Sequence, residues 1–209
     1  MTAADLFCRI STLLENAGIP YMLTGSFASS VYGMHRSSPN INFIIAAEEA
    51  GVRRLFDHLP QLDFYSDLNH ALDACRHGSI FNVLDHVTGL KIDFIFLKSR
   101  VFSQEEFGRR KKAFVWEFPL YIATPEDVVI EKLEWKKLGK SSRQIQDAAG
   151  ILKVRDVELD LPYIENGSPS SASARNGPRP ASSRTWINNS QRVQNDLTII
   201  CNFLVRKRT

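Results

Sequence analysis

Hydrophobic residues follow two different spacings along residues 1–165. Over residues 2–17 they recur every three to four positions, as on one face of an amphipathic helix, and Gly18 follows as a stop signal. Further on, apolar residues form short continuous runs, which are typical of strands covered on both faces. The strands predicted from these runs are residues 19–24, 42–46, 81–86 and 90–97. Helical spacing returns at residues 26–32 and 48–58, whereas residues 61–78 give no clear pattern.

Two turn signals organise the rest of this region. Thr88-Gly89 separates the last two predicted strands and indicates a hairpin. Residues 124–127 read Thr-Pro-Glu-Asp, which combines a capping hydroxyl, proline at the first helical position and acids in the first turn. The helix that starts there is expected to run to residue 138. A second helix, capped by Ser141 or Ser142, and a third that begins at Asp160 are expected to follow.

Together these elements predict an α/β (α+β) fold, in which helices flank a mixed β-sheet and a helical segment follows. The predicted folded domain covers residues 1–165, with a core at 3–122 and a helical part at 124–165. The chain has 209 residues and 44% apolar content, which suffices for a domain with a real core. No run approaches the roughly 20 apolar residues of a membrane span. The N-terminus lacks the basic start of a signal peptide, and three scattered cysteines match neither disulfide nor zinc spacings, so a cytoplasmic location is expected.

The C-terminal residues 166–209 differ from the rest in composition. Residues 166–182 are rich in Ser, Pro, Gly and Asn, which predicts a disordered, low-complexity tail. The tail carries seven Lys or Arg against one Asp, a net charge of +6; because the whole chain is +3, residues 1–165 sum to −3. A slightly acidic body does not favour broad nucleic-acid binding. Within the body, the four basic residues 109–112 are predicted to form an exposed basic segment.

The candidate chemistry lies between the first two predicted strands. The first strand ends in Gly25-Ser26, and the second apolar run opens with Asn40 and Asn42 on either side of Ile41. Residues i and i+2 of a strand point to the same side, so both amides are expected to face one point beside the Gly25-Ser26 turn.

This arrangement resembles the nucleotidyltransferase superfamily, and more narrowly the AbiEii toxin type and minimal nucleotidyltransferase-like proteins. The resemblance covers residues 3–165. Those proteins carry Gly-Ser, about a dozen residues and then Asp-x-Asp, where this sequence has Asn40-Ile41-Asn42. The resemblance implies transfer of a nucleoside monophosphate from a nucleoside triphosphate to a hydroxyl of RNA, protein or a small molecule, with Mg²⁺ as cofactor. A cognate antitoxin is a further partner that it suggests.

The resemblance also assigns roles to individual residues. Gly25 and Ser26 match the turn that holds the phosphates, and Lys132 matches a lysine that reaches the triphosphate. Asp93 matches the third, catalytic carboxylate. Asp147 matches an aspartate on the helix after Lys132. The metal positions are Asn40, Asn42 and Asp93.

Each of these residues also has a plainer interpretation. Gly25-Ser26 alone is an ordinary turn, Asp93 alone could be a solvated edge-strand carboxylate, and Lys132 alone could lie on a solvated helix face. Order and spacing together favour the nucleotidyltransferase interpretation.

Asparagine at two ligand positions limits what can be expected of activity. Asn is nearly isosteric with Asp, so the fold should survive, but two negative charges are missing and an amide is a weaker Mg²⁺ ligand. A naturally degenerate member and a chain whose aspartates were replaced are both consistent with the sequence. Two further functions stay open, namely a catalytically inactive module that binds nucleotide or a partner, and an antibiotic-modifying nucleotidyltransferase.

Overall fold

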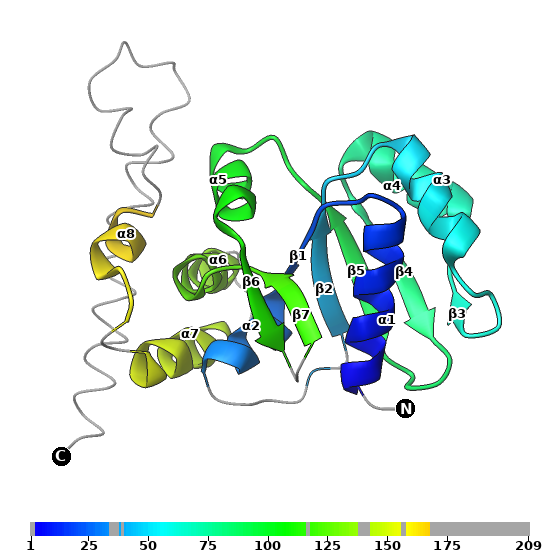
Figure 1. Ribbon diagram of the computed structural model, residues 1–209. Coiled ribbons are helices and arrows are strands. Elements are labelled where there is room, and N and C mark those ends of the chain that lie inside the picture. Colours follow the sequence, from blue (N-terminus) through cyan, green and yellow to red (C-terminus); the bar gives the residue numbers. More distant parts are fainter. Residues whose placement is uncertain are drawn as a thin grey trace, which may run out of the picture. The chain divides into compact units, whose positions relative to one another are not determined.

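The computed structural model describes residues 3–33, 38, 40–115, 118–137, 143–155 and 158–167 (Figure 1). The chain divides into two compact units. The first comprises Met1–Ala28 and Arg36–Ala123, and the second comprises Ser29–His35 and Thr124–Thr209. Among the described helices, none combines the length and the apolar character needed to cross a membrane.

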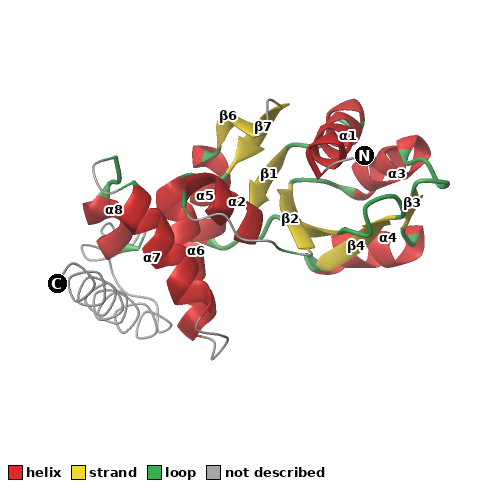
Figure 2. Cartoon of the chain, turned by 90° about the horizontal axis from the view of Figure 1, so that it is seen from below, coloured by secondary structure: helices red, strands yellow, loops and turns green. Residues whose placement is uncertain are grey.

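The first unit is built on a mixed seven-stranded sheet in the order β3-β4-β5-β2-β1-β7-β6 (Figures 1 and 2). The strands are β1 (Tyr21–Thr24), β2 (Asn40–Ile45), β3 (Phe64–Tyr65), β4 (Ile80–Asp85), β5 (Lys91–Phe96), β6 (Lys111–Val115) and β7 (Phe118–Ile122). The pairs β1–β7 and β2–β5 are parallel, and the other neighbouring strands are antiparallel. The predicted mixed sheet is confirmed, and the four predicted strands are its central members β4, β5, β2 and β1.

Helices and aromatic rings make the core of this unit. The helices are α1 (Ala3–Asn16), α3 (Glu49–His58), α4 (Leu68–His77), α5 (Val101–Arg109) and the beginning of α2 (Gly25–Tyr32), whose residues from Ser29 on belong to the second unit. Phe7 of α1 packs edge-on against Phe43 of β2, and Phe56 of α3 packs on Phe81 of β4. Phe94 of β5 contacts both Phe43 and Phe81, so the rings form a continuous layer on one face of the sheet.

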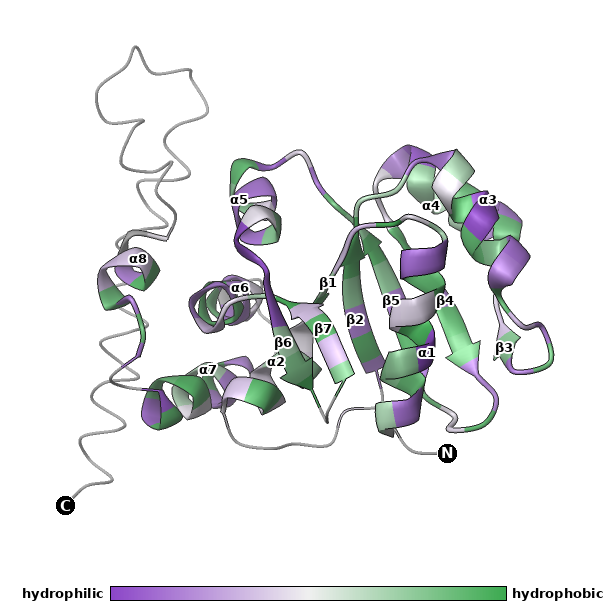
Figure 3. Cartoon of the chain, viewed as in Figure 1, coloured by the Kyte–Doolittle hydropathy of each residue, from purple (hydrophilic) through white to green (hydrophobic). Residues whose placement is uncertain are grey.

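The opposite face of β4, β5 and the beginning of β2 is more polar. Burial alternates along β4, with Phe81 and Val83 buried and Ile80, Asn82 and Leu84 exposed. This alternation follows from the period of two in a strand. Figure 3 shows the change along β2, which is hydrophilic at its beginning and hydrophobic at its end. The beginning of β2 therefore brings polar side chains to this face.

The second unit contains α6 (Pro125–Lys137), α7 (Arg143–Val154) and α8 (Leu161–Asn166), with α6 packed against both other helices. The predicted start of α6 is confirmed. The Thr124 hydroxyl donates to Asp127 Oδ2 at 2.6 Å and accepts from the Asp127 amide at 3.3 Å. Tyr163 of α8 donates its hydroxyl to Asp127 Oδ1 at 2.6 Å, which ties α8 to the first turn of α6. Asp160 caps α8, as expected, by accepting from the Tyr163 amide at 2.9 Å.

Some expectations fall partly or wholly outside the described residues. The caps proposed at Ser141 and Ser142 lie in the segment 138–142, outside that part of the chain. The tail predicted over 166–209 lies outside it from residue 168 on, while Asn166 belongs to α8 and Gly167 follows it as the C-cap.

Two segments differ from the sequence-based expectations. Residues 61–78, without a clear pattern, form β3 and α4, and Asp67 caps α4 by accepting from the amides of Asn69 and His70. The predicted exposed basic run is wrong as a single segment, because residue 109 ends α5 and residue 111 begins β6. Lys111 and Lys112 are exposed, but Arg110 is half-buried with its guanidinium 4.1 Å from the centre of the Phe107 ring. Stacking of a long cationic side chain on an aromatic ring accounts for this partial burial.

Candidate functional site

The site predicted from the sequence lies where four neighbouring strands place polar residues in one row. Asn42 of β2 pairs in register with Thr24 of β1 on one side and with Asp93 of β5 on the other. Asp93 in turn pairs with Asn82 of β4. Cross-strand partners project from the same face of a sheet, so these four side chains form a continuous polar row. Asn42 and Asp93, two of the positions that the resemblance assigns to metal, are therefore direct neighbours across two strands.

Asp93 is the carboxylate of this row, and both of its oxygens accept from neighbouring side chains. Oδ1 lies 2.6 Å from Asn82 Nδ2 and 3.1 Å from the Lys91 ammonium. Oδ2 accepts from Asn40 Nδ2 at 3.4 Å. The Asp93 side chain is only 15% exposed, which makes these contacts the main compensation for its charge. The interpretation of Asp93 as a solvated edge-strand carboxylate is therefore wrong, because β5 is an inner strand of the sheet.

The chain turns at Gly25, directly after β1, and this turn lies close to Asn42 of the row. The φ of Gly25 is +70°, in the left-handed region that favours glycine. A Cβ added there would lie 2.8 Å from Asn42 Nδ2 and 3.2 Å from Asn42 Cγ. Gly25 thus has two reasons to be glycine, its conformation and the close approach to Asn42. Ser26 follows in the first turn of α2, where backbone amides suit an anion.

Replacing Gly25 by Ala should reveal this close approach. The left-handed conformation alone costs an L-residue about 1–2 kcal/mol, and displacement of Asn42 should add about 1 kcal/mol, the low end for overpacking. Gly89→Ala is the matched control, because Gly89 has φ +71° and no atom within 4 Å of an added Cβ. Urea denaturation should show the larger loss of unfolding free energy for Gly25→Ala. Equal losses, or an excess that persists in an Asn42→Ala background, would contradict the contact.

The residues of this row do not fit a pair of Mg²⁺ ions. Mg²⁺ sites in proteins rely on carboxylates in near-octahedral geometry. Among the described residues, no group of three or more His, Cys, Asp or Glu side chains is placed to hold a metal ion. The row offers one carboxylate, Asp93, whose oxygens already accept from Asn40, Asn82 and Lys91. Asn40 and Asn42 lie where the sequence placed them, but their assignment as metal ligands stays a prediction.

Lys132 and Asp147 lie in the second unit, and there they face each other. Lys132 Nζ is 3.0 Å from Asp147 Oδ2, and the two side chains are 4% and 9% exposed. The interpretation of Lys132 as part of a solvated helix face is therefore wrong. Its predicted role in reaching a triphosphate stays a prediction.

Sequence reasoning missed three residues of the site, Thr24, Asn82 and Lys91. Lys91 stands two positions before Asp93 on the same strand, so strand alternation alone could have placed it on the same face. Asn82 required the register of the β4–β5 hairpin. Asp85 fixes the turn of that hairpin by accepting from the Thr88 hydroxyl at 2.6 Å and the Thr88 amide at 2.8 Å.

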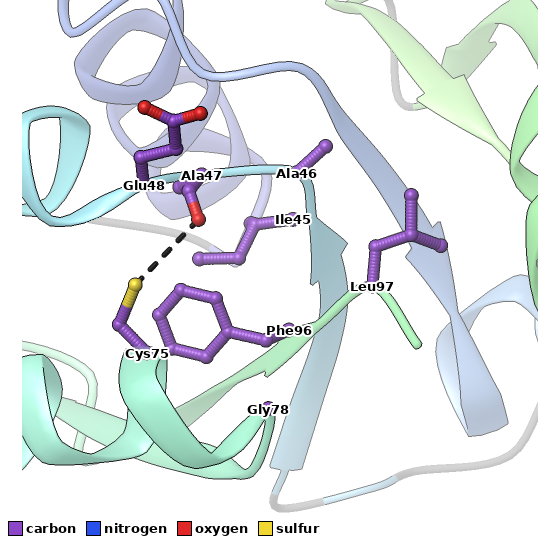
Figure 4. A pocket seen from close by; sticks show the side chains of 8 residues that line it. All are labelled: Ile45, Ala46, Ala47, Glu48, Cys75, Gly78, Phe96 and Leu97. Carbon is purple, nitrogen blue, oxygen red and sulfur yellow. Dashed lines mark hydrogen bonds between the residues drawn. The ribbon is translucent and has the colours of Figure 1, made fainter. Parts of the chain in front are cut away.

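A separate pocket of about 360 Å³ lies at the other end of β2 and β5 (Figure 4). It is lined by Ile45, Ala46, Ala47, Glu48, Cys75, Gly78, Phe96 and Leu97. The Cys75 thiol donates to the Ala47 carbonyl at 3.6 Å, and burial, together with nearby Glu49, raises the pKa of the Cys75 thiol. A raised pKa favours the thiol over the reactive thiolate, so the pocket holds no activated nucleophile. None of the residues predicted for the site lines it.

Comparisons with known proteins identify the fold. No protein-family model matches the chain, and no curated protein matches its sequence. The lincosamide antibiotic adenylyltransferase LnuA, in its lincomycin-bound crystal structure, is 10% identical, with 74% of this chain and 98% of that chain covered and a TM-score of 0.52. ANT(2")-Ia in complex with adenylyl-2"-tobramycin is 11% identical, with 84% and 99% covered and a TM-score of 0.53. At this identity the similarity concerns the fold, and the chain has the nucleotidyltransferase fold.

Proposed function

From this fold and the polar row, we propose that the chain binds a nucleoside triphosphate beside Gly25, Ser26, Asn42 and Asp93, and that it transfers the nucleotide only weakly. The observation that carries the proposal is the close approach of Gly25 to Asn42. It brings the first turn of a helix, with amides that suit an anion, against the polar residues of β2 and β5. Phosphates at this turn would lie within reach of the row.

The weakness of transfer follows from the charges of the row. Attack of a hydroxyl on the α-phosphorus, with pyrophosphate leaving, places much of its charge stabilisation on divalent metal ions. Asn40 and Asn42 supply neutral amide oxygens, and Asp93 supplies the single carboxylate of the three. A reaction that depends on metals is therefore expected to be slow, whereas binding of the triphosphate does not require all three charges.

Different observations support two classes of acceptor for the transferred nucleotide. The sequence resemblance to the AbiEii toxin type supports a hydroxyl of RNA or protein, with an antitoxin as regulatory partner. The two fold neighbours named above are an antibiotic adenylyltransferase and a protein bound to an adenylylated antibiotic, which supports an antibiotic as second candidate.

Binding of nucleoside triphosphates, measured by isothermal titration calorimetry, tests the proposal directly. The chain should bind at least one of ATP, GTP, CTP or UTP, and Ser26→Ala should weaken that binding roughly tenfold, because a hydrogen bond to a charged phosphate is lost. Ser99→Ala, at an exposed position after β5, is the matched control and should leave the affinity unchanged.

Transfer is followed in parallel with a labelled triphosphate, Mg²⁺ or Mn²⁺, and candidate RNA, protein and antibiotic acceptors. Little or no label should reach any acceptor. Absence of binding by all four triphosphates would refute the nucleotide site. Robust metal-dependent transfer would instead refute the weak-transfer part of the proposal.

A further inference from the structure

We infer that the Lys91 ammonium is a built-in cation of this site, which offsets the charge of Asp93 and allows a nucleoside triphosphate to bind without a divalent metal. The inference rests on the proposed nucleotide site. It concerns how the charges of Asp93 and of a bound triphosphate are offset there. It starts from the mismatch between the row and a pair of metal ions.

The Lys91 side chain is directed at the row and does not simply extend into solvent. Lys91 lies on β5 two residues before Asp93, and its register partner on β2 is Asn40. The ammonium is 3.1 Å from Asp93 Oδ1, and the Lys91 side chain is 42% exposed. The positive charge therefore lies beside the carboxylate at the open side of the row, where a ligand can reach it.

Asp93 does not depend on Lys91 alone. Asn82 donates to Oδ1 at 2.6 Å, and Asn40 donates to Oδ2 at 3.4 Å. These two amides would continue to satisfy the carboxylate if the ammonium turned toward a phosphate. A lysine suits such a movement, because its charge sits at the end of a flexible four-carbon chain.

The charges of this group leave no surplus of carboxylates to hold a dication. Asp93 and Lys91 carry one charge each, of opposite sign, and Asn40, Asn42 and Asn82 are neutral, so the group has no net charge. A divalent cation would meet the repulsion of Lys91 without a surplus of carboxylates to offset it. A triphosphate would meet the Lys91 ammonium, a group that binds phosphate oxygens, while Asn40 and Asn82 keep the Asp93 carboxylate satisfied.

The simplest competing explanation is an ion pair without a role in binding. Partly exposed ion pairs contribute little to stability, so Lys91 could be replaced without consequence. The two explanations differ in what loss of the Lys91 charge does to a bound anion when no metal is present, and this quantity can be measured.

The test is calorimetric titration of the full chain with ATP, and with the other triphosphates, in EDTA and in Mg²⁺. The native chain should bind in EDTA at least as tightly as in Mg²⁺. Lys91→Gln should weaken binding in EDTA at least tenfold, and Lys91→Arg, which keeps the charge, should stay within about threefold. Lys98→Gln removes the same charge at an exposed position beyond the far end of β5 and should stay within about twofold. Melting temperatures of all variants check that each is folded.

The outcomes separate the inference from the proposed function. Binding that requires Mg²⁺, or unchanged binding by Lys91→Gln in EDTA, would overturn the role of Lys91 and leave the nucleotide site intact. Binding of no triphosphate in either buffer would overturn the nucleotide site itself, and the role of Lys91 with it. Equal weakening by Lys91→Gln and Lys98→Gln would reduce the effect to net charge and would also overturn the inference.

Discussion

Replacing Asn40 and Asn42 together by aspartate should convert the row into a metal site. The double substitution adds two negative charges beside Asp93 and changes the side-chain shapes little, so that the carboxylates outnumber the Lys91 ammonium by two. Mn²⁺ affinity should rise at least about a hundredfold, equivalent to about 2.7 kcal/mol. Metal-dependent transfer from a labelled triphosphate should rise by several orders of magnitude once the right acceptor is present. Either single substitution should recover less than the pair, because groups that act on the same ion are not additive.

The same variant carries a readout that does not depend on activity. In EDTA the three carboxylates repel one another, and the contact from Asn40 Nδ2 to Asp93 Oδ2 is lost. The melting temperature should therefore fall in EDTA and rise with added Mn²⁺, since a ligand that binds only the folded state stabilises it. Asn16→Asp with Asn69→Asp adds the same charge at exposed helix positions and is the matched control. A comparable response to Mn²⁺ in that control would contradict a local metal site.

The parts of the fold that the sequence predicted are those with strong local patterns. Phe43 and Phe94 are buried in the aromatic layer. The apolar runs around them predicted inner strands of a sheet. The cap at Thr124 predicted the start of α6 correctly. Its partner Asp127 is only three residues away, so the signal is local. The edge strand β6 was missed because exposed Lys111, Lys112 and Phe114 give it no apolar run. The inner strand β7 does have an apolar run, but Pro119 interrupts it.

The sequence predicted the parts of the candidate site that depend on local spacing. It did not predict the contacts that depend on the register between strands. The spacing of Asn40 and Asn42 is local, and their shared face follows from strand geometry. Donation from Asn82 to Asp93 depends on how a hairpin pairs, and the Asn40–Asp93 contact spans 53 positions. Such long-range contacts are set by tertiary packing, which single-sequence patterns do not encode. Asparagine at position 40 acquires a structural meaning only in the folded chain, where its amide donates to Asp93.

The ion pair between Lys132 and Asp147 is a second contact that depends on tertiary packing and that the sequence did not predict. Lys132 is charged and has Glu131 and Glu134 close by in the sequence, so the plainer interpretation placed it on a solvated helix face, although Val128 and Val129 stand one turn before it. Packing of α6 on α7 nevertheless leaves the Lys132 side chain 4% exposed and puts Asp147 opposite its ammonium. A charge is buried here together with a complementary charge, which offsets part of the cost of removing both from water.

Substituting Asn for Asp147 should destabilise the protein strongly. The substitution keeps the shape of the side chain and removes the charge that faces a buried ammonium, and loss of one partner of a buried ion pair costs about 3–5 kcal/mol. Chemical denaturation should show a loss of about 3 kcal/mol in unfolding free energy. Replacing both partners with apolar residues, Lys132→Met with Asp147→Leu, should recover most of that loss, because neither buried charge remains.

Glu158→Gln provides the matched control for this prediction within the same unit. Glu158 accepts from Arg155 at 2.7 Å, but the two side chains are 68% and 36% exposed. An exposed pair contributes about 0–1 kcal/mol, so this variant should lose little stability. A loss for Asp147→Asn no larger than that for Glu158→Gln would show that burial does not set the cost of the Lys132 charge. A double variant less stable than Asp147→Asn would show that Lys132 contributes through contacts other than its pairing with Asp147.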